Sequence, residues 1–157
     1  MRKQKGFSLI ELLIVVAIIL IIAAIAIPNL LRSRIAANEA SAVGSLRTIN
    51  TAEVTYASTY PDAGFAGTLK ALGPISGSTP TSAAAGLLDS VLGCDTMPCN
   101  KSGYQFTVTG GVSYYYATGT PQNVGQTGQR GFYTDGSGVI RYNNSGSSPT
   151  NTDSPLQ

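Results

Sequence analysis

The stretch that decides the fold stands at the start of the chain, where residues 6–11 read GFSLIE and residues 7–27 read FSLIELLIVVAIILIIAAIAI. Glu11 is the only charged residue among the 21 residues from Phe7 to Ile27. A helix of this length is about 31 Å long, which is enough to cross the hydrocarbon core of a bilayer. The segment therefore predicts a membrane-length helix with one acidic side chain close to its start.

Glu11 is the most informative residue of this helix. A charge at the centre of a transmembrane helix costs roughly 2.5 to 3.5 kcal/mol on insertion scales, so such a residue usually has a function. A carboxylate that stays hydrated near the headgroups would need none, and we favour the functional interpretation. Cleavage after Gly6 would create an amine on Phe7, four residues before Glu11 and on the same helix face. The two charges are then expected to pair within one chain, or between neighbouring chains whose axial register they would set.

Basic residues flank the apolar run on both sides. Arg2, Lys3 and Lys5 precede it and favour a cytoplasmic N-terminus, whereas three arginines between positions 32 and 47 follow it and weaken the asymmetry. The pattern suggests an orientation without proving it.

An ordinary secretory signal peptide is the main alternative for this segment. Ala24-Ile25-Ala26 has the small-x-small pattern that signal peptidase accepts. Against this alternative stand the carboxylate inside the apolar run and a helical pattern that continues past Ala26.

The charge balance and the residue types exclude several classes of function. Lys and Arg number 10 and Asp and Glu number 8, and removing the three leader bases leaves 7 basic against 8 acidic side chains. No basic stripe remains for a phosphate backbone, so specific nucleic-acid binding is not expected. The chain has no histidine, the commonest general base and a frequent zinc ligand. We therefore expect no enzymatic activity, no cofactor and no metal site.

Pro28 directly follows the apolar run. It lacks a backbone donor and its ring clashes with the preceding turn, so we expect a kink or a locally melted turn near residues 24–28.

A second helical pattern runs from Asn29 to about Ser58. Its apolar positions recur at spacings of three, four and seven residues, and they are Leu31, Ile35, Ala42, Leu46, Ile49 and Tyr56. Three charged residues, Glu39, Arg47 and Glu53, are expected mostly beside this stripe as solvated surface charges. Tyr60-Pro61-Asp62 is expected to end the helix.

The rest of the chain is rich in turn-forming residues. Residues 84–92 (AAGLLDSVL) are expected to form one or two helical turns. Strands are expected at residues 103–109, 112–118, 131–135 and 138–143, as two hairpins of an antiparallel sheet. Tyr114 to Tyr116 read as alternating faces of a strand. The Asp135-Gly-Ser-Gly sequence indicates a hairpin turn rather than a calcium site, because a second acid at suitable spacing is missing.

Two cysteines, Cys94 and Cys99, enclose a short segment. Without other soft ligands the pair cannot complete a structural zinc site, so a disulfide is the favoured interpretation and two free thiols the alternative. In an oxidising compartment such a bridge contributes about 2 kcal/mol of stability.

The basic leader ending in Gly6, the sequence from Phe7 to Glu11, the long apolar helix and Pro28 together resemble type IV pilins and the pseudopilins of type II secretion. The resemblance covers roughly residues 1–60, and in its strict form residues 1–28. It implies cleavage by a prepilin peptidase between Gly6 and Phe7, N-methylation of Phe7, and a role of Glu11 in subunit recruitment. Many pilins place their cysteine pair toward the C-terminal end of the sheet, whereas Cys94 and Cys99 precede all the expected strands. The adhesive role of that region in pilins therefore cannot be transferred.

We accordingly expect an α+β, pilin-like fold, with a long N-terminal helix packed on a small antiparallel C-terminal sheet. The expected parts are a leader at 1–6, a transmembrane or filament-core helix at 7–28, an amphipathic continuation at 29–60, a loop-rich globular part with the sheet at 61–144, and a disordered tail at 145–157.

The expected function is that of a pilin, the structural subunit of a type IV pilus-like filament. Its expected partners are copies of itself, a prepilin peptidase and N-methyltransferase, the membrane and an inner-membrane assembly platform. The expected location is the inner membrane, spanned once with the N-terminus in the cytoplasm, and later an extracellular or periplasmic filament. A pseudopilin is the alternative within the family, and a soluble secreted binding module released after Ala26 is the alternative outside it.

Overall fold

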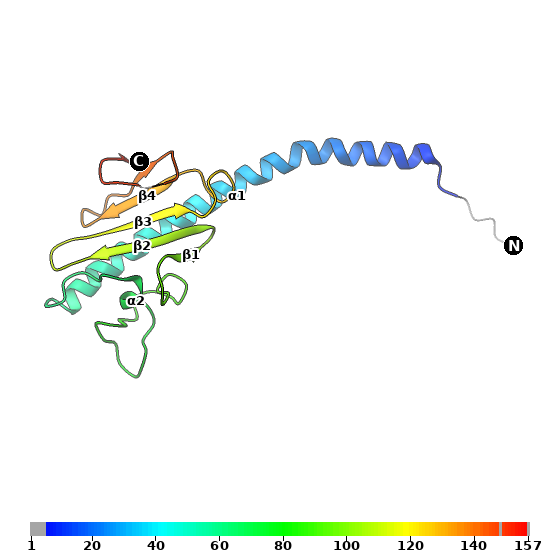
Figure 1. Cartoon of the computed structure of the whole chain (residues 1–157). Coiled ribbons are helices and arrows are strands. Elements are labelled where there is room, and N and C mark those ends of the chain that lie inside the picture. The colour runs from blue at the N-terminus through cyan, green and yellow to red at the C-terminus, as the bar shows by residue number, and fades with distance from the viewer. Residues whose placement is uncertain (1–5, 148, 157) are drawn as a thin grey trace. The chain divides into compact units, whose positions relative to one another are not determined.

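One long helix dominates the computed structural model, which describes residues 6–147 and 149–156. Helix α1 runs without interruption over Leu9–Thr59, with Pro28 inside it (Figure 1). The locally melted turn expected near Pro28 is therefore wrong, while a bend there stays a prediction. The chain divides into two compact units between Arg34 and Ile35, and α1 contributes residues to both.

The second unit contains the sheet. Its six strands are all antiparallel and follow one another in chain order. They are β1 (Cys99–Lys101), β2 (Tyr104–Gly110), β3 (Tyr115–Pro121), β4 (Gly131–Asp135), β5 (Arg141–Asn143) and β6 (Ser154–Pro155). The predicted α+β class is thus confirmed, with β3 beginning three residues later than expected and β5 shorter.

The core of this unit lies between the sheet and the part of α1 that follows residue 38 (Figure 1). The buried apolar residues that α1 contributes are Ala42, Leu46, Ile49, Ala52 and Tyr56, and the sheet contributes Tyr104, Phe106, Val108, Ala117 and Phe132. Four of the six predicted stripe positions are therefore buried. Leu31 and Ile35 are not, because the packed stretch of the helix begins only at Glu39.

Two segments differ from expectation. Residues 84–92 form no helix beyond a single turn, in which the Gly93 N–H donates to the Asp89 carbonyl at 2.7 Å. Before that turn, the N–H groups of Ala85, Leu87 and Leu88 donate to carbonyls of Ala71 and Leu72 at 2.8 to 2.9 Å instead. These acceptors belong to a short helix that was not expected, α2 (Leu69–Leu72).

The C-terminal segment is also more ordered than expected. Ser154 and Pro155 form β6 against β5, and the Leu156 N–H donates to the Ile140 carbonyl at 2.7 Å. Asp153 holds the residues before β6 in place, because its Oδ2 accepts hydrogen bonds from the Thr150 N–H and from Asn143 Nδ2. The predicted disordered tail is therefore wrong for the described residues from 145 onward.

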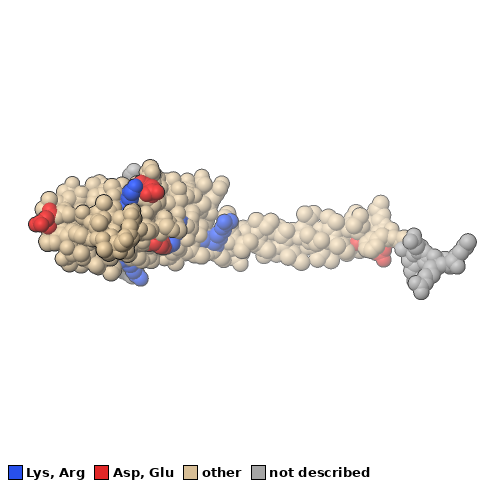
Figure 2. All heavy atoms as spheres, turned by 90° about the horizontal axis from the view of Figure 1, so that it is seen from below, with Lys and Arg blue, Asp and Glu red and all other residues tan. Residues whose placement is uncertain are grey.

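Glu39 and Glu53 correct the expectation of solvated surface charges on α1. Charged atoms are sparse on the face seen in Figure 2, and these two of the chain's 8 acids are buried, at 7% and 0% exposure. Both lie in phase with the apolar stripe, because Glu39 precedes Leu46 by seven residues and Glu53 follows it by seven. Arg47 is exposed, as expected.

Glu39 is held by the connection between β3 and β4. Its Oε1 accepts the N–H groups of Gln129 and Arg130, each at 3.0 Å, and its Oε2 lies 2.8 Å from both Nε and Nη2 of Arg130. Burial alone would raise the pKa of Glu39, but these hydrogen bonds and the Arg130 charge outweigh burial and lower that pKa. The carboxylate is thus a stable anion inside the protein.

Glu53 has weaker compensation. Its Oε2 accepts the Ala66 N–H at 2.8 Å, while its buried Oε1 has no hydrogen-bond partner among the described residues. Burial raises the pKa of Glu53 to about 7, opposed only by the Ala66 N–H. The side chain therefore titrates near neutral pH.

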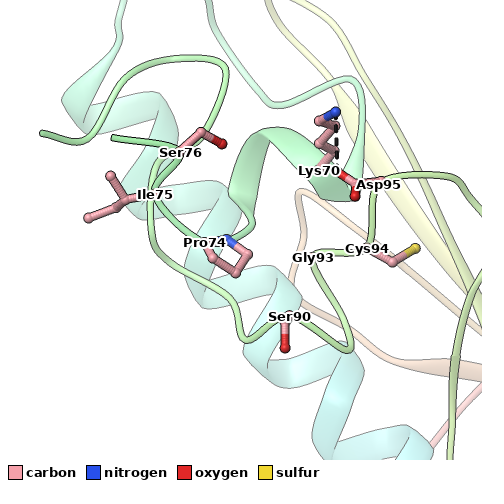
Figure 3. Close-up of a pocket in the computed structure, with 8 residues that line it drawn as sticks. All are labelled: Lys70, Pro74, Ile75, Ser76, Ser90, Gly93, Cys94 and Asp95. Atoms are coloured by element: carbon pink, nitrogen blue, oxygen red, sulfur yellow. Dashed lines mark ion pairs between the residues drawn. The ribbon is translucent and has the colours of Figure 1, made fainter. Parts of the chain in front are cut away.

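A loop region between α2 and β1 contains a small hollow and the disulfide. The hollow has a volume of about 220 Å³ and is lined by residues such as Pro74, Ile75 and Ser90, with Lys70 and Asp95 forming an ion pair at 3.2 Å (Figure 3). Both members of that ion pair are largely exposed, so it contributes little to stability.

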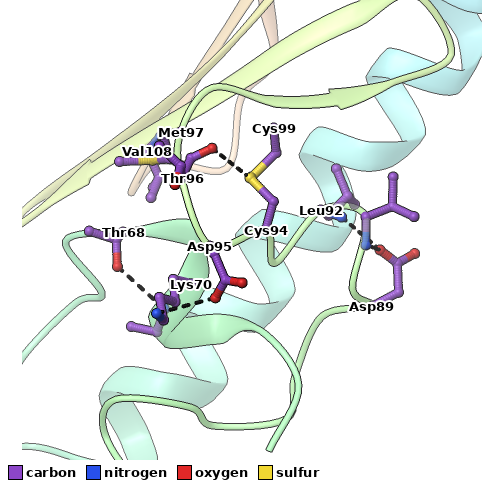
Figure 4. Close-up of a disulfide and its surroundings, with 12 residues drawn as sticks. Thr68, Lys70, Asp89, Leu92, Cys94, Asp95, Thr96, Met97, Cys99 and Val108 are labelled. Carbon is purple, nitrogen blue, oxygen red and sulfur yellow. Dashed lines mark hydrogen bonds and ion pairs between the residues drawn. A yellow bond between two sulfur atoms is a disulfide. The ribbon is translucent and has the colours of Figure 1, made fainter. Parts of the chain in front are cut away.

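The predicted disulfide between Cys94 and Cys99 is present, with Cα atoms 5.6 Å apart (Figure 4). Cys99 is the first residue of β1 and is buried. On the other side of the loop, Asp89 Oδ1 accepts the N–H groups of Val91 and Leu92, at 3.0 and 2.7 Å. The bridge therefore ties a turn-rich segment to the edge of the sheet.

Replacing Glu53 by Gln should stabilise the globular unit at pH 8 by about 3 kcal/mol and leave its stability nearly unchanged below about pH 4.5. Between the ordinary pKa of 4.5 and the folded value of about 7, the folded state holds a proton that the unfolded chain has released. The stability of the wild type therefore falls as pH rises through this window. Thermal unfolding of the full chain in non-ionic detergent, followed by the near-ultraviolet circular dichroism of its tyrosines, measures the effect. Equal pH dependence in both proteins would contradict the burial of an ionisable Glu53.

Replacing Cys94 by Ser should lower the free energy of unfolding by about 2 kcal/mol, because the reduced loop gains conformational freedom in the unfolded chain. Reduced wild type should match the variant in denaturant titrations. Two alkylatable thiols in protein freshly isolated from its native source, or a stability insensitive to reductant, would rule out this role.

Candidate assembly site in the N-terminal helix

The first turn of α1 is closed by Ser8 and Glu11. The Ser8 N–H donates to Glu11 Oε2 at 2.9 Å, and the Ser8 carbonyl accepts the Leu12 N–H at 3.2 Å. Ser8 stands at the N-cap and Glu11 at the third helical position, so the side chain of Glu11 reaches back as in a capping box. An anion in the first turn also interacts favourably with the helix dipole.

The sequence contained this signal, because Ser8-Leu9-Ile10-Glu11 matches the S-x-x-E spacing of a capping box. Ser8 was not among the predicted site residues, which paired Glu11 with an amine on Phe7. The structure adds a local role for Glu11, which is to fix the residue at which the helix begins.

Gly6 and Phe7 precede the helix in a non-helical, exposed stretch, and Phe7 is 80% exposed. The bond between them is therefore open to solvent in this conformation. No geometry for a free amine on Phe7 exists here, because Gly6 is still attached.

The apolar part of α1 has no cover from its own chain. Between residues 7 and 30 the large apolar side chains are exposed by between 46% (Val16) and 80% (Phe7). Among the described residues α1 is the one helix that is long and apolar enough to cross a membrane, and no residue of its most apolar window is buried. Length and composition would also fit a signal sequence or a core helix, but a core helix would be buried. An apolar surface of this extent requires lipid or another protein.

The remaining predicted site residues are also placed. Pro28 lies within α1, and Cys94 and Cys99 form the disulfide of the globular unit. Within residues 6–147 and 149–156, no three His, Cys, Asp or Glu side chains gather as metal ligands would.

Comparison with known proteins agrees with the N-terminal features. Residues 1–27 match the family model of the prokaryotic N-terminal methylation motif. The chain is 67% identical over 39 residues to the type IV wide pilus major component PilA4 of Thermus thermophilus, a match that covers 25% of this chain and 30% of that protein. It is 45% identical over 54 residues to the type IV major pilin protein PilA of Myxococcus xanthus, covering 34% of this chain and 24% of that protein.

The matched regions thus span less than a third of the length of either relative. No solved structure matches the chain. In its N-terminal region the chain is therefore similar to type IV pilins, through the methylation motif and the two major pilins it matches, and this region continues into an α+β arrangement of a long helix and a C-terminal antiparallel sheet.

Proposed function

We propose that the chain is the structural subunit of a type IV pilus-like filament, assembled from the inner membrane through the N-terminal part of α1. One observation carries the proposal, namely an apolar helix that its own chain leaves fully uncovered. Before assembly, lipid would cover this apolar surface. In the filament, the corresponding helices of neighbouring subunits would cover it instead. Burial of apolar surface is the driving force for such an assembly.

Processing is proposed at the bond between Gly6 and Phe7, followed by N-methylation of Phe7. The methylation motif at residues 1–27 supports this proposal, as does the exposed, non-helical backbone around the bond. A protease must bind its substrate in an extended form, and a bond inside α1 would not offer one. The peptidase and N-methyltransferase that act on prepilins are the proposed partners at this step.

Glu11 is proposed to recruit the subunit to the growing filament. In the described structure one of its oxygens accepts the Ser8 N–H, and the other makes no hydrogen bond to any described residue. That second oxygen is therefore available to an amine on Phe7, on the same chain or on a neighbouring one. In an apolar surrounding an unpaired carboxylate is costly, so pairing would favour one axial register among several.

The proposed topology is a single crossing of the inner membrane with the N-terminus in the cytoplasm, next to an assembly platform. The globular unit would then lie on the oxidising side, where the bridge between Cys94 and Cys99 is stable. After assembly the subunit would belong to an extracellular or periplasmic filament.

Two alternatives differ in what they require. A pseudopilin of type II secretion would use the same N-terminal signal, and the similarity to two major pilins favours the pilus. A secreted binding module would need cleavage after Ala26, which lies in the middle of α1.

The mature N-terminus distinguishes these classes. We expect mass spectrometry of the protein from its native membrane or filament to find a chain that begins with N-methylated Phe7. A chain that begins at Ile27 would support secretion and contradict the proposal.

Replacing Glu11 by Ala should leave membrane insertion intact, or improve it, while filament yield falls by about a hundredfold or more, because removing one partner of a buried ion pair costs roughly 3 to 5 kcal/mol. Glu11→Gln is the matched control, because its carbonyl oxygen can still accept the Ser8 N–H. If the charge recruits the subunit, Gln should assemble as poorly as Ala. Normal assembly of the Gln variant would show that the cap, not the charge, is what matters, and normal assembly of both would remove Glu11 from the mechanism.

Removing residues 1–28 should yield a soluble monomer, because the packed core begins at Glu39 and lies wholly in the second unit. Polymerisation should be lost with the apolar segment. Sedimentation should give a single monomeric species, and circular dichroism should show both helix and sheet. An aggregate or an unfolded chain would count against an independent globular unit.

A further inference from the structure

An aromatic pocket lies at one end of the sheet, within the second unit. Its walls come from the loop after α1, the turn between β2 and β3, the first residues of β3, and the end of β4 with the turn that follows. The pocket has a volume of about 480 Å³, a size typical of small-molecule sites. We define the aromatic pocket by its five rings, those of Phe65, Tyr114, Tyr115, Tyr116 and Tyr133.

The rings pack on one another and still present free surface. Phe65 and Tyr115 lie with ring centroids 4.8 Å apart, and Tyr116 and Tyr133 are stacked at 5.9 Å with 17° between their planes. As predicted for alternating strand faces, Tyr115 is buried, whereas Tyr114 and Tyr116 are 57% and 37% exposed. Tyr115, Tyr116 and Tyr133 belong to strands of the sheet, so these three rings would lose little conformational freedom on binding.

Among the residues that the structure describes, Asp135 is the only one with a charged side chain that lines the pocket. Its Oδ1 accepts the Ser137 N–H at 2.9 Å and the Ser137 hydroxyl at 2.6 Å, which orients the carboxyl group at the rim. No Lys or Arg among the described residues forms an ion pair with it. The pocket therefore combines aromatic ring faces with a carboxylate that forms no ion pair with the described residues.

The tyrosines experience this negative field. Burial, followed by the charges of Glu53 and Asp135, raises the pKa of Tyr115 to about 12. Burial and then Asp135 also raise the pKa of Tyr133, which Arg141 lowers in part. The Asp135 carboxylate thus disfavours a further negative charge in the pocket and favours a positive one.

We propose that the aromatic pocket binds an organic cation, an alkylammonium group that sits against the tyrosine faces beside Asp135. The face of an aromatic ring attracts a cation through its quadrupole, and desolvated sites gain most from this attraction. A neutral sugar would use the rings but would gain little from the carboxylate, and an anion would be repelled by it. Two sources present the same chemistry, a small quaternary amine such as a choline group and the side chain of a lysine on another protein.

The test uses the full chain in a polyoxyethylene detergent, which carries neither a sugar nor an ammonium group. The chain has no tryptophan, and four of its 8 tyrosines line the pocket, so binding is followed by the change in tyrosine fluorescence that Tyr114→Ala reduces. Choline is titrated against 3,3-dimethyl-1-butanol, its neutral carbon analogue of nearly the same shape. We expect choline to bind about tenfold more tightly, as a cation–π contact next to a carboxylate implies. The lysine analogue Nα-acetyl-lysine methylamide is titrated in parallel, and its affinity relative to choline identifies the source.

Variants of the chain distinguish the contribution of the Asp135 charge from that of the shape of the aromatic pocket. Asp135→Asn removes the charge but keeps an oxygen that can accept both Ser137 hydrogen bonds, and it should weaken choline about tenfold while leaving the neutral analogue unchanged. Tyr114→Ala should weaken choline severalfold. Asp62→Asn and Val112→Ala are the controls, since both positions are exposed and neither lines the pocket. Circular dichroism verifies that each variant retains its fold.

Three results would overturn the proposal. Equal affinity for choline and its neutral analogue would reduce the site to an apolar hollow. Saturable binding of methyl glucoside without binding of either amine would identify a sugar site. Choline binding that is absent, or that Asp135→Asn leaves unchanged, would remove the organic cation as the ligand.

Discussion

The position of α1 on the sheet depends on two carboxylates that the helix buries, Glu39 and Glu53. They are 53 − 39 = 14 residues apart, close to four helical turns, so they project from the same face. Each accepts backbone N–H groups from a different connection, at residues 129–130 and at residue 66. A slip of the helix by one residue would turn both away from their donors by about 100°. The slip would also turn the apolar stripe away from the sheet, and the N–H groups of residues 66, 129 and 130 would lose their acceptors.

Hydrogen bonds and ion pairs stabilise the two carboxylates unequally. The two ends of the part of α1 that packs on the sheet therefore have different properties. Arg130 stacks over the rings of Phe132 and Tyr142, at 5.5 and 5.3 Å from their centroids, and is thereby fixed for its pair with Glu39. Glu53 has a single donor, the Ala66 N–H, in a segment that packs closely on the end of β2. A Cβ at Gly110 would lie 2.2 Å from the Ala66 carbonyl oxygen, so this approach requires glycine. The neighbouring Phe65 is a wall of the aromatic pocket, which therefore lies next to the more weakly compensated carboxylate.

Sequence patterns that extend over many residues predicted the structure better than patterns of only a few residues. The apolar run, the proline after Tyr60 and the alternating aromatic strands gave α1, its end at Thr59, β2 and β4. Strands β1 and β6 have three and two residues and no alternating pattern, because they are defined by their partners and not by their own composition. Helix α2 is similarly short and depends on the N–H donors of residues 85–88, which no local propensity reveals.

Prediction of the candidate site was limited in the same way, because contacts defined by the folded geometry were missed. Glu11 was recognised as unusual because a charge in an apolar run is conspicuous, whereas Ser8 was missed because its role appears only in the geometry of a cap. Glu39 and Glu53 were assigned to the surface by residue type, although their spacing placed them on the buried stripe. For a charged residue in phase with an apolar stripe, periodicity was a better guide than polarity, provided that donors were available on the facing connections.

Helix α1 is continuous, but its two parts have different surroundings. From Leu12 to Ile27 the helix is apolar on all sides, whereas in the second unit it has one buried stripe and an outer face with few charges. Polar residues on that outer face are mostly Ser and Thr whose hydroxyls donate to the carbonyl four residues earlier, at 2.8 to 3.1 Å, and they are Thr48, Thr51, Thr55, Ser58 and Thr59. A hydroxyl that is already bonded to its own helix loses little when water is removed, while in water it still accepts hydrogen bonds. This arrangement makes the outer face compatible with solvent and with close packing alike, without the desolvation cost that a row of charged side chains would impose.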